Sequence, residues 1–363
     1  MTTDDLKYMR RAMQLALLGE GLVSPNPMVG AVIVADHRII GEGYHHEYGG
    51  PHAEVNAIRS VADADLHLLK QATIFVTLEP CSHYGKTPPC SKLIINTGIP
   101  RVVVGAPDPN PKVNGCGVRM MREAGIEVVE GVLAQECVEL NHRFMTAQLL
   151  HRPFIQLKWA ETADGFMASG NEQERLIISN PESMTLMHRE RGMADAIFVG
   201  TNTIISDNPG LDCRLWPGKN PHPATFNSPR LPGNSRIMER KPFLKEKTES
   251  WLQFFRRLLH DENINSVMVE GGKLTLESLI AEELFDEIRI ETSPFTLEEL
   301  INHRSGGTKP GREKKEERNS VCLKGVKAPS VSVSSLLEKG FRRVIKTQPA
   351  SNTIITLRRP IYF

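Results

Sequence analysis

The sequence lacks any run of about 20 apolar residues, the length that a membrane-spanning helix needs, so no membrane partner is expected. An excess of one charge is also missing, because 44 Lys and Arg residues face 43 Asp and Glu residues among the 363. Aromatic residues make up only 6% of the chain. Proteins that bind nucleic acids usually combine a basic excess with stacking aromatics. The composition therefore disfavours a nucleic-acid base deaminase or binding protein, and we expect no nucleic-acid partner.

Cysteine is sparse, with six residues spread over the whole chain. The N-terminal stretch, MTTDDLKYMRR, has acidic residues where a secretory signal peptide would be positively charged. The sequence thus predicts a cytoplasmic protein, in which thiols stay reduced. Closely placed cysteines in such a protein are more often metal-binding or catalytic than disulfide-forming.

Hydrophobic periodicity divides the chain into two halves, and we expect domains at 1–148 and 152–363. Strands that alternate with helices indicate the α/β class. In the first half we expect strands at 29–35, 39–44, 72–79, 101–106 and 127–132, and helices at 5–18, 52–61, before Gly98, at 117–124 and at 134–150. In the second half we expect strands at 154–160, 196–200, 266–272 and 287–291, and helices near 181–192 and 274–284.

The segment 302–319 is polar, charged and rich in glycine. This composition is typical of an exposed loop or a disordered, flexible insertion. A phosphate-binding or nucleic-acid-binding arm is the functional alternative, although acidic residues dilute its positive charge.

A possible metal site is the strongest chemical signal in the sequence. His52 is followed by Cys81 and Cys90, and imidazole and thiolate are the ligands that zinc prefers. Three protein ligands leave a fourth position for water, and zinc-bound water loses its proton near neutral pH. A structural zinc would need a fourth protein ligand, for which His83 is a candidate.

Glu54 lies two residues after His52, in the first turn of an expected helix. A carboxylate beside the metal could take a proton from the water and pass it to a leaving amine. The order H-x-E, then P-C, then C is that of zinc-dependent nucleobase deaminases. Their usual cysteine spacing is two residues, whereas eight separate Cys81 from Cys90 here. A coincidental match with buried cysteines is the remaining alternative.

Longer segments carry a more specific resemblance. The first half resembles the bifunctional deaminase/reductases of riboflavin biosynthesis, in which eight residues between the cysteines are the norm. This resemblance rests on SPNPMVGAVIV (24–34), GEGYHHEYGGPHAEVNAI (41–58), TLEPCSHYGKTPPC (77–90) and VGAPDPNPKVNGCGVRMMREAGIEV (104–128).

The resemblance implies a three-layer, cytidine-deaminase-like domain over 1–148. It implies hydrolytic deamination of 2,5-diamino-6-ribosylamino-4(3H)-pyrimidinone 5′-phosphate, a small phosphorylated pyrimidine. His52, Cys81 and Cys90 would then hold Zn2+, with Glu54 as the catalytic residue. The matching pocket positions, Asn26 and His45, would contact the substrate. Asn26 stands between two prolines, so a turn-forming role is equally open.

The second half resembles the reductase part of the same family, which has a dihydrofolate-reductase-like α/β fold. The matching segments are RPFIQLKWAETADGF (152–166), VGTNTIISDNPGLDCRL (199–215) and VMVEGGKLTLESLI (267–280). The resemblance implies that NADPH reduces the ribosyl side chain to a ribityl chain. It also implies a homo-oligomer.

The reductase residues follow from the same match. Cofactor-binding positions would be Thr203, Asp207, Gly271 and Gly272, and substrate-binding positions would be Leu211, Arg214 and Glu270. Backbone N–H groups of a glycine pair before a helix can approach a phosphate. The alternatives are a tight turn for the glycine pair, a turn cap for Asp207 and a surface ion pair for Arg214.

One departure from the family concerns the strand that normally follows a His-Pro dipeptide. Here His222-Pro223 is followed by ATFNSPRLPGNSR, which has no long hydrophobic run. We therefore expect this strand to be missing from the cofactor-binding sheet. Two hypotheses follow: a bifunctional enzyme, or a deaminase whose second half is only a structural or assembly module.

Overall fold

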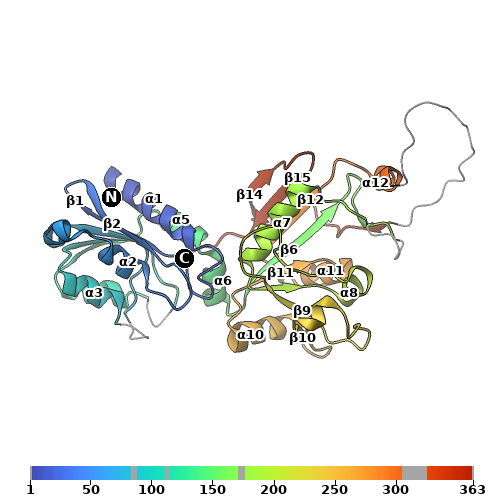
Figure 1. The fold of residues 1–363 in the computed structure, drawn as a ribbon, viewed down its shortest axis with the longest axis horizontal. Helices are drawn as coiled ribbons and strands as arrows, with labels where there is room; N and C mark the ends of the chain where they lie inside the picture. Colours follow the sequence, from blue (N-terminus) through green and yellow to red (C-terminus); the bar gives the residue numbers. More distant parts are fainter. Residues whose placement is uncertain (1, 83–87, 111–113, 171–175, 305–324, 362–363) are drawn as a thin grey trace, which may run out of the picture. The chain divides into compact units, whose positions relative to one another are not determined.

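The computed structural model describes all residues except 1, 83–87, 111–113, 171–175, 305–324 and 362–363. The chain forms two compact units (Figure 1). His83 and most of the charged segment lie outside the described residues, while 302–304 end a helix. The first unit comprises Met1–Pro153, Leu259–Asn265 and Ile361–Phe363, and the second comprises Phe154–Leu258 and Ser266–Pro360.

A five-stranded sheet with the order β2-β1-β3-β4-β5 forms the centre of the first unit. Strand β1 is antiparallel to β2 and β3, whereas β3, β4 and β5 are parallel. Asp36 and His37 have positive φ angles of 49° and 59°, as a tight hairpin turn between β1 and β2 requires. The strands are β1 (Gly30–Ala35), β2 (Arg38–Tyr44), β3 (Thr73–Leu78), β4 (Arg101–Ala106) and β5 (Glu127–Val129).

Helices cover both faces of this sheet and produce three layers. Ala31 and Ile33 of β1 pack in a core with α2, α3 and α4, whereas Val32 and Val34 pack in a core with α1, α5 and α6. Successive strand residues point to opposite faces, so a continuous apolar strand must be covered on both sides. The helices are α1 (Thr3–Ala16), η1 (Leu17–Gly19), α2 (Ala53–Arg59), η2 (Asp63–Gln71), α3 (Cys90–Thr97), α4 (Cys116–Glu123), α5 (Ala134–Leu140) and α6 (His142–Leu150).

The single helix expected at 134–150 is wrong, because it is interrupted at Asn141. The Asn141 side chain accepts a hydrogen bond from the backbone N–H of Met28 and donates one to its carbonyl, each 2.8 Å long. An amide that makes both bonds substitutes for a strand neighbour. Asn141 thus fixes the segment before β1, which carries Asn26.

An eight-stranded sheet with the order β10-β9-β8-β11-β6-β12-β15-β14 forms the second unit. The first six strands in this order are parallel, and β15 and β14 add an antiparallel edge. The strands are β6 (Phe154–Glu161), β8 (Ala196–Phe198), β9 (His222–Phe226), β10 (Phe243–Lys245), β11 (Ser266–Glu270), β12 (Glu287–Thr292), β14 (Arg342–Thr347) and β15 (Thr353–Arg358). A separate antiparallel pair consists of β7 (Phe166–Ala168) and β13 (Val326–Lys327).

The strand expected to be missing after His222-Pro223 is present as β9, so this expectation is wrong. It pairs in parallel with β8 on one side and β10 on the other. Pro223 is only its second residue, and a proline near the start of a strand costs few ladder hydrogen bonds. Phe226 at its end packs against Phe198 and against Trp251 of α10, at ring centroid distances of 5.1 and 5.4 Å. Aromatic packing of this kind stabilises a strand too short to be recognised by its hydrophobic run.

Helices flank the second sheet and connect its strands. Among the described residues, no helix in either unit combines the length and the apolar character needed to cross a bilayer. The helices are α7 (Pro181–Met193), α8 (Thr201–Asp207), α9 (Arg236–Glu239), α10 (Trp251–Glu262), α11 (Lys273–Ala281), α12 (Leu297–Arg304) and α13 (Val333–Glu338).

Candidate functional site

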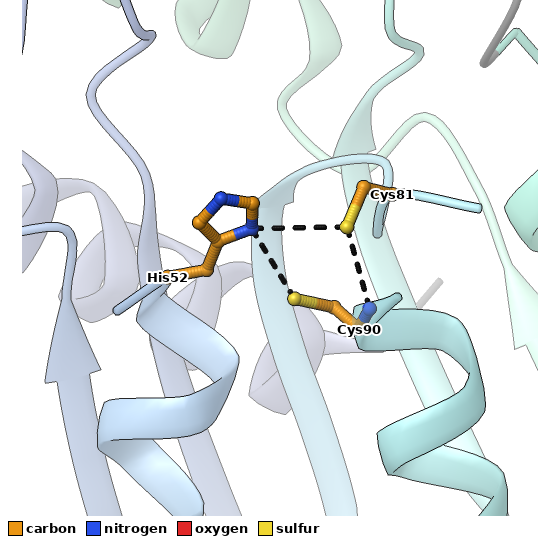
Figure 2. A group of neighbouring side chains, drawn as sticks. All are labelled: His52, Cys81 and Cys90. Atoms are coloured by element: carbon orange, nitrogen blue, oxygen red, sulfur yellow. Dashed lines mark hydrogen bonds between the residues drawn. The ribbon is translucent and has the colours of Figure 1, made fainter. Parts of the chain in front are cut away.

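Three ligand side chains converge at the N-terminal ends of two helices (Figure 2). His52 is the residue before α2, Cys90 is the first residue of α3, and Cys81 lies in the loop after β3. The His52 Nδ1 atom lies 3.3 Å from the Cys90 Sγ atom and 3.7 Å from the Cys81 Sγ atom. All three ligand atoms lie within 4.8 Å of one another.

This donor set fits zinc. Nitrogen and sulfur ligands of a tetrahedral zinc lie roughly 3.3–3.8 Å from one another, given the usual bond lengths. The two nitrogen–sulfur distances fall in this range. One imidazole and two thiolates leave the fourth position for water or substrate, which is the pattern of a catalytic site.

The two cysteine thiols have pKa values that are shifted in opposite directions. Hydrogen bonds with Cys90 and with His52 lower the pKa of the Cys81 thiol to about 4, against the effect of burial. The same hydrogen bond raises the pKa of Cys90, and burial raises it further. The hydrogen bond with Cys81 also raises the pKa of His52. Cys81 is thus poised as a thiolate, while Cys90 must release a proton to become a ligand.

Glu54 is buried beside these ligands, in the first turn of α2. Because His52 precedes the helix with an extended backbone (φ −70°, ψ 164°), its side chain is not bound by helical periodicity. Burial raises the pKa of Glu54 from 4.5 to about 7, and the negative charge of Cys81 contributes. A carboxyl with this pKa can both accept and return a proton near neutral pH.

Asn26 and His45 lie together next to the metal ligands. The Asn26 Nδ2 atom is 3.0 Å from the His45 Nε2 atom, and the His45 ring is 5.6 Å from the ring of His52, centroid to centroid. The His45 Nδ1 atom is 3.0 Å from the carbonyl oxygen of Pro51, which can only accept. Burial lowers the pKa of His45. The neutral ring therefore carries its proton on Nδ1, and Nε2 accepts from the Asn26 amide.

The backbone of Asn26 also forms the turn that the sequence left open, because its N–H donates to the carbonyl of Val23 at 2.9 Å. The turn and the contact with His45 therefore occur together. The loop fixes the backbone, and the side chain extends toward His45.

A pocket of about 450 Å³ lies in the second unit. Three of the residues expected from the sequence, Asp207, Leu211 and Arg214, line it. Arg214 also forms the alternative ion pair, with Asp212 at 2.6 Å, and its side chain is 54% exposed. Asp207 is the last residue of α8. The other residues that line the pocket are Met184, Met187, His188, Arg191, Asn208, Pro209, Gly210 and Arg236.

Glu270, at the end of β11, reaches this pocket through Arg191. Two hydrogen bonds of 2.8 and 2.6 Å join its carboxylate to the Arg191 guanidinium. Both side chains are nearly buried, and Arg191 lines the pocket. The structure thus places Glu270 behind the pocket wall.

The glycine pair lies at a second place, where the parallel strands β8 and β11 end. Gly271 and Gly272 have φ angles of 81° and 67°, a conformation that favours glycine. A Cβ atom on Gly272 would lie 3.6 Å from the Thr203 hydroxyl, so Thr203 and the glycine pair are adjacent. The carboxyl ends of parallel strands are where α/β sheets bind ligands. The tight turn at Gly271 and Gly272 is therefore present, and the same backbone conformation is compatible with the expected cofactor-binding role.

Comparison with known proteins decides the family. The chain is 39% identical over 322 residues to the riboflavin biosynthesis protein RibD of Aquifex aeolicus, covering 82% of this chain and 89% of the relative. It is 35% identical to RibD of Escherichia coli, covering 85% and 92%.

The chain belongs to the RibD family.

Family models and solved structures agree with this assignment. Residues 2–106 match the cytidine and deoxycytidylate deaminase zinc-binding region, and residues 153–299 match the RibD C-terminal domain. The Acinetobacter baumannii RibD structure aligns with a TM-score of 0.81 at 27% identity, over 99% of each chain. A Thermotoga maritima deaminase/reductase aligns with a TM-score of 0.77 at 33% identity, over 98% of this chain and 99% of that chain.

Several predictions from the sequence are confirmed by these matches: the α/β fold class with its two parts, membership of the family, and a bifunctional riboflavin-biosynthesis enzyme. As a RibD-family enzyme, the chain has deaminase and reductase activities and uses Zn2+ and NADPH. The alternative of a deaminase with a non-catalytic second half is not favoured.

Sequence reasoning missed Glu79, which lies two residues before Cys81. Its buried carboxylate accepts hydrogen bonds from the backbone N–H groups of Gly115 and Gly117, at 2.9 and 3.1 Å, at the start of α4. A Cβ atom on Gly117 would lie 2.1 Å from the carbonyl oxygen of Pro80. Glu79 and Pro80 thereby fasten the segment before Cys81 to α4. The sequence feature that could have revealed Glu79 is the position of an acidic residue immediately before Pro80-Cys81.

Arg191 and Lys158 were also missed, since neither stands in a distinctive motif. Lys158 on β6 is the register partner of Glu270 on β11. Its Nζ atom lies 3.5 Å from the sulfur of Met187, a pocket residue. Burial lowers the pKa of Lys158, while Glu270 and Glu291 oppose this shift. The pocket therefore has a buried charged network behind it.

Proposed function

We propose that the first unit deaminates diaminohydroxyphosphoribosylaminopyrimidine, and that the second unit reduces the product, 5-amino-6-(5-phosphoribosylamino)uracil. These are the reactions in the name of the Thermotoga maritima protein. The observation that carries the proposal is the convergence of His52, Cys81 and Cys90 beside the buried Glu54.

In the deaminase, we assign His52, Cys81 and Cys90 as the zinc ligands. Zinc supplies there a Lewis acid that activates a water molecule. The Glu54 carboxylate, with a pKa of about 7, takes a proton from the attacking water and delivers it to the departing amino group. Its burial keeps competing water away and holds this pKa in the useful range.

We assign substrate binding in the deaminase to Asn26 and His45. Because the Asn26 Nδ2 atom donates to His45, the amide orientation is fixed and its Oδ1 atom points away from that bond. An oriented amide oxygen can accept a hydrogen bond from an amino group of the pyrimidine. The carbonyl of Pro51 holds the His45 ring in turn.

In the reductase, we assign the pocket lined by Asp207, Leu211 and Arg214 to the sugar-phosphate substrate. Arg191 and Arg236 add positive charge to its lining, and guanidinium groups suit phosphate oxygens. Glu270 acts by orienting Arg191. NADPH, when bound, supplies the hydride.

We assign the cofactor's phosphate-bearing part to Thr203, Gly271 and Gly272. The glycine pair precedes α11, whose first N–H groups form a favourable environment for an anion. Asp207 ends α8, the helix that begins near Thr203. The cofactor-binding residues thus lie on α8 and on the loop between β11 and α11.

For domains, we propose that residues 1–148 form the deaminase and 152–363 the reductase. The segments Leu259–Asn265 and Ile361–Phe363 are exceptions, because they belong to the first compact unit. A homo-oligomer remains a prediction from the resemblance, and a cytoplasmic location remains a prediction from the N-terminal sequence. Analytical ultracentrifugation of the purified chain tests the first.

Two assays on the same purified chain test the proposal. Ammonia release is measured with the diaminopyrimidine phosphate, and NADPH consumption with 5-amino-6-(5-phosphoribosylamino)uracil. We expect both reactions, together with quenching of intrinsic fluorescence when NADPH binds. Ammonia release without NADPH binding would instead mean a deaminase with a non-catalytic second half.

A further inference from the structure

His188 is a buried histidine that the reaction scheme above does not use. Its relative exposure is 0%. Within the described part of the chain, neither Nδ1 nor Nε2 has a hydrogen-bond partner. Buried polar side-chain atoms are nearly always hydrogen-bonded, and each exception calls for an explanation. Neighbouring Arg191, by contrast, donates from two guanidinium nitrogens to Glu270 and from the third to the backbone carbonyl of Asp212.

The position of His188 on α7 directs it to the reductase pocket. Met184, Met187, His188 and Arg191 all line that pocket. Their spacing of three and four residues places them on one face of the helix. The two methionines are the flexible members of this face, so small movements of their side chains can open the ring nitrogens to a ligand.

Charged groups surround His188 on several sides. Arg191 follows it on α7, Arg214 and Asp212 lie on the loop after α8, and Glu270 lies at the end of β11. Burial lowers the pKa of His188, the two arginines lower it further, and the two acids oppose them. The ring is therefore neutral near neutral pH and has one N–H donor.

We propose, on the basis of the proposed reductase function, that His188 recognises the phosphate group of the reductase substrate by donating a ring N–H to a phosphate oxygen. Arg191, Arg214 and Arg236 line the pocket together with Asp207, and Glu270 and Asp212 each pair with one of these arginines. The guanidinium groups supply N–H donors that suit the oxygens of a phosphate. The phosphate supplies the acceptor that His188 lacks among the residues that the structure describes. His188 is thus a specificity residue for phosphorylated over unphosphorylated substrate.

Binding of the phosphate should also change the protonation of the His188 ring. A phosphate dianion beside the ring favours the imidazolium form, because an opposite charge nearby raises a histidine pKa. Substrate binding to the wild-type reductase should therefore take up protons near neutral pH. Titration calorimetry in buffers with different ionisation enthalpies measures this uptake without any mutation.

The test compares wild type, His188→Phe, His188→Asn and the exposed-residue control His260→Phe. Each full-length protein is assayed with 5-amino-6-(5-phosphoribosylamino)uracil and with the same compound after phosphatase treatment. We expect His188→Phe to raise the KM for the phosphorylated compound about tenfold, the loss of one charge-assisted hydrogen bond. It should leave the KM for the dephosphorylated compound, NADPH binding and ammonia release unchanged. His188→Asn, which keeps a donor, should restore part of the discrimination.

The outcomes separate this inference from the function on which it rests. If wild type consumes no NADPH, the proposed reductase function fails. If wild type is active but His188→Phe loses affinity equally for both compounds, or for neither, the phosphate-recognition role is wrong. Should the second unit of His188→Phe not fold, as judged by lost NADPH binding, the His188→Asn ratio and the proton uptake of wild type decide. An absence of proton uptake, with unchanged discrimination in His188→Asn, would overturn the inference.

Discussion

The side-chain amide of Asn26 lies 3.0 Å from the Nε2 atom of His45, and the carbonyl of Pro51 fixes the proton of that ring on Nδ1. This chain of contacts leads from the loop before β1 to the residue that precedes His52. These hydrogen bonds orient Asn26 and do not involve His52, whose ring lies 5.6 Å from the His45 ring, centroid to centroid. Substrate binding and zinc binding should therefore respond to different substitutions.

Replacing Asn26 with Asp should weaken deamination while leaving zinc in place. A carboxylate cannot donate to Nε2, and its charge would raise the pKa of His45, which burial holds low in the native protein. We expect the deaminase KM to rise at least about tenfold, because the side chain loses the hydrogen bond to His45 that orients it toward the substrate. Steady-state ammonia release measures it, with zinc content and reductase activity as controls. Loss of zinc would show that Asn26 supports the metal centre instead.

Glu54→Gln should keep zinc and nearly abolish deamination. The amide has a similar shape but cannot carry a proton between water and amine, a role that contributes about 10²–10⁴-fold. Zinc is quantified by atomic emission and ammonia by a coupled assay. The matched control is Glu42→Gln, which removes a partly exposed carboxylate paired with Arg11. Undiminished ammonia release from zinc-loaded Glu54→Gln would refute the role of Glu54.

Zinc affinity should fall as the pH is lowered. Cys90 and His52 both have raised pKa values, so each tends to hold a proton that the metal must displace. Raising the pH removes these protons and strengthens binding, whereas Cys81, with its pKa of about 4, stays deprotonated throughout the neutral range. Competition with a chelator at several pH values measures the slope. A zinc affinity that does not vary across neutral pH would contradict the assigned ligand set.

Glu79→Ala should destabilise the first unit and loosen the metal centre. It leaves the N–H groups of Gly115 and Gly117 without their carboxylate partner, at a cost of about 1–3 kcal/mol in the free energy of unfolding. Denaturant unfolding measures the change. Zinc release to a chelator should become faster, since the segment before Cys81 loses its attachment to α4. Unchanged stability and unchanged zinc release would show that Glu79 does not hold this segment.

The metal-site residues could be predicted from sequence because the signal is local. His52 and Glu54 are two residues apart, Cys81 follows closely on a clear strand, β3, and Cys90 begins the next helix, α3. Asn26 and His45 came only from the family resemblance. The contact between the Asn26 amide and His45 depends on the geometry of two loops. No local sequence pattern predicts it.

The reductase pocket could be predicted only in part, because its charges pair over long distances in the sequence. Arg191 and Glu270 are 79 residues apart and meet only once β11 lies beside β8 and β6. Strand β9 was missed because five residues with a proline at the second position carry little periodicity. Its stability depends on aromatic contacts with Phe198 and Trp251, which no local pattern reveals.

The most direct test of the central claim, that this one chain performs both reactions, is mass spectrometry of the products. The purified zinc-loaded protein is incubated with the diaminopyrimidine phosphate, first without and then with NADPH. The account predicts one mass change without NADPH, from exchange of the amino group for oxygen. With NADPH it predicts a second, from addition of two hydrogens to the sugar chain. A product that stops at the first change despite saturating NADPH would contradict it.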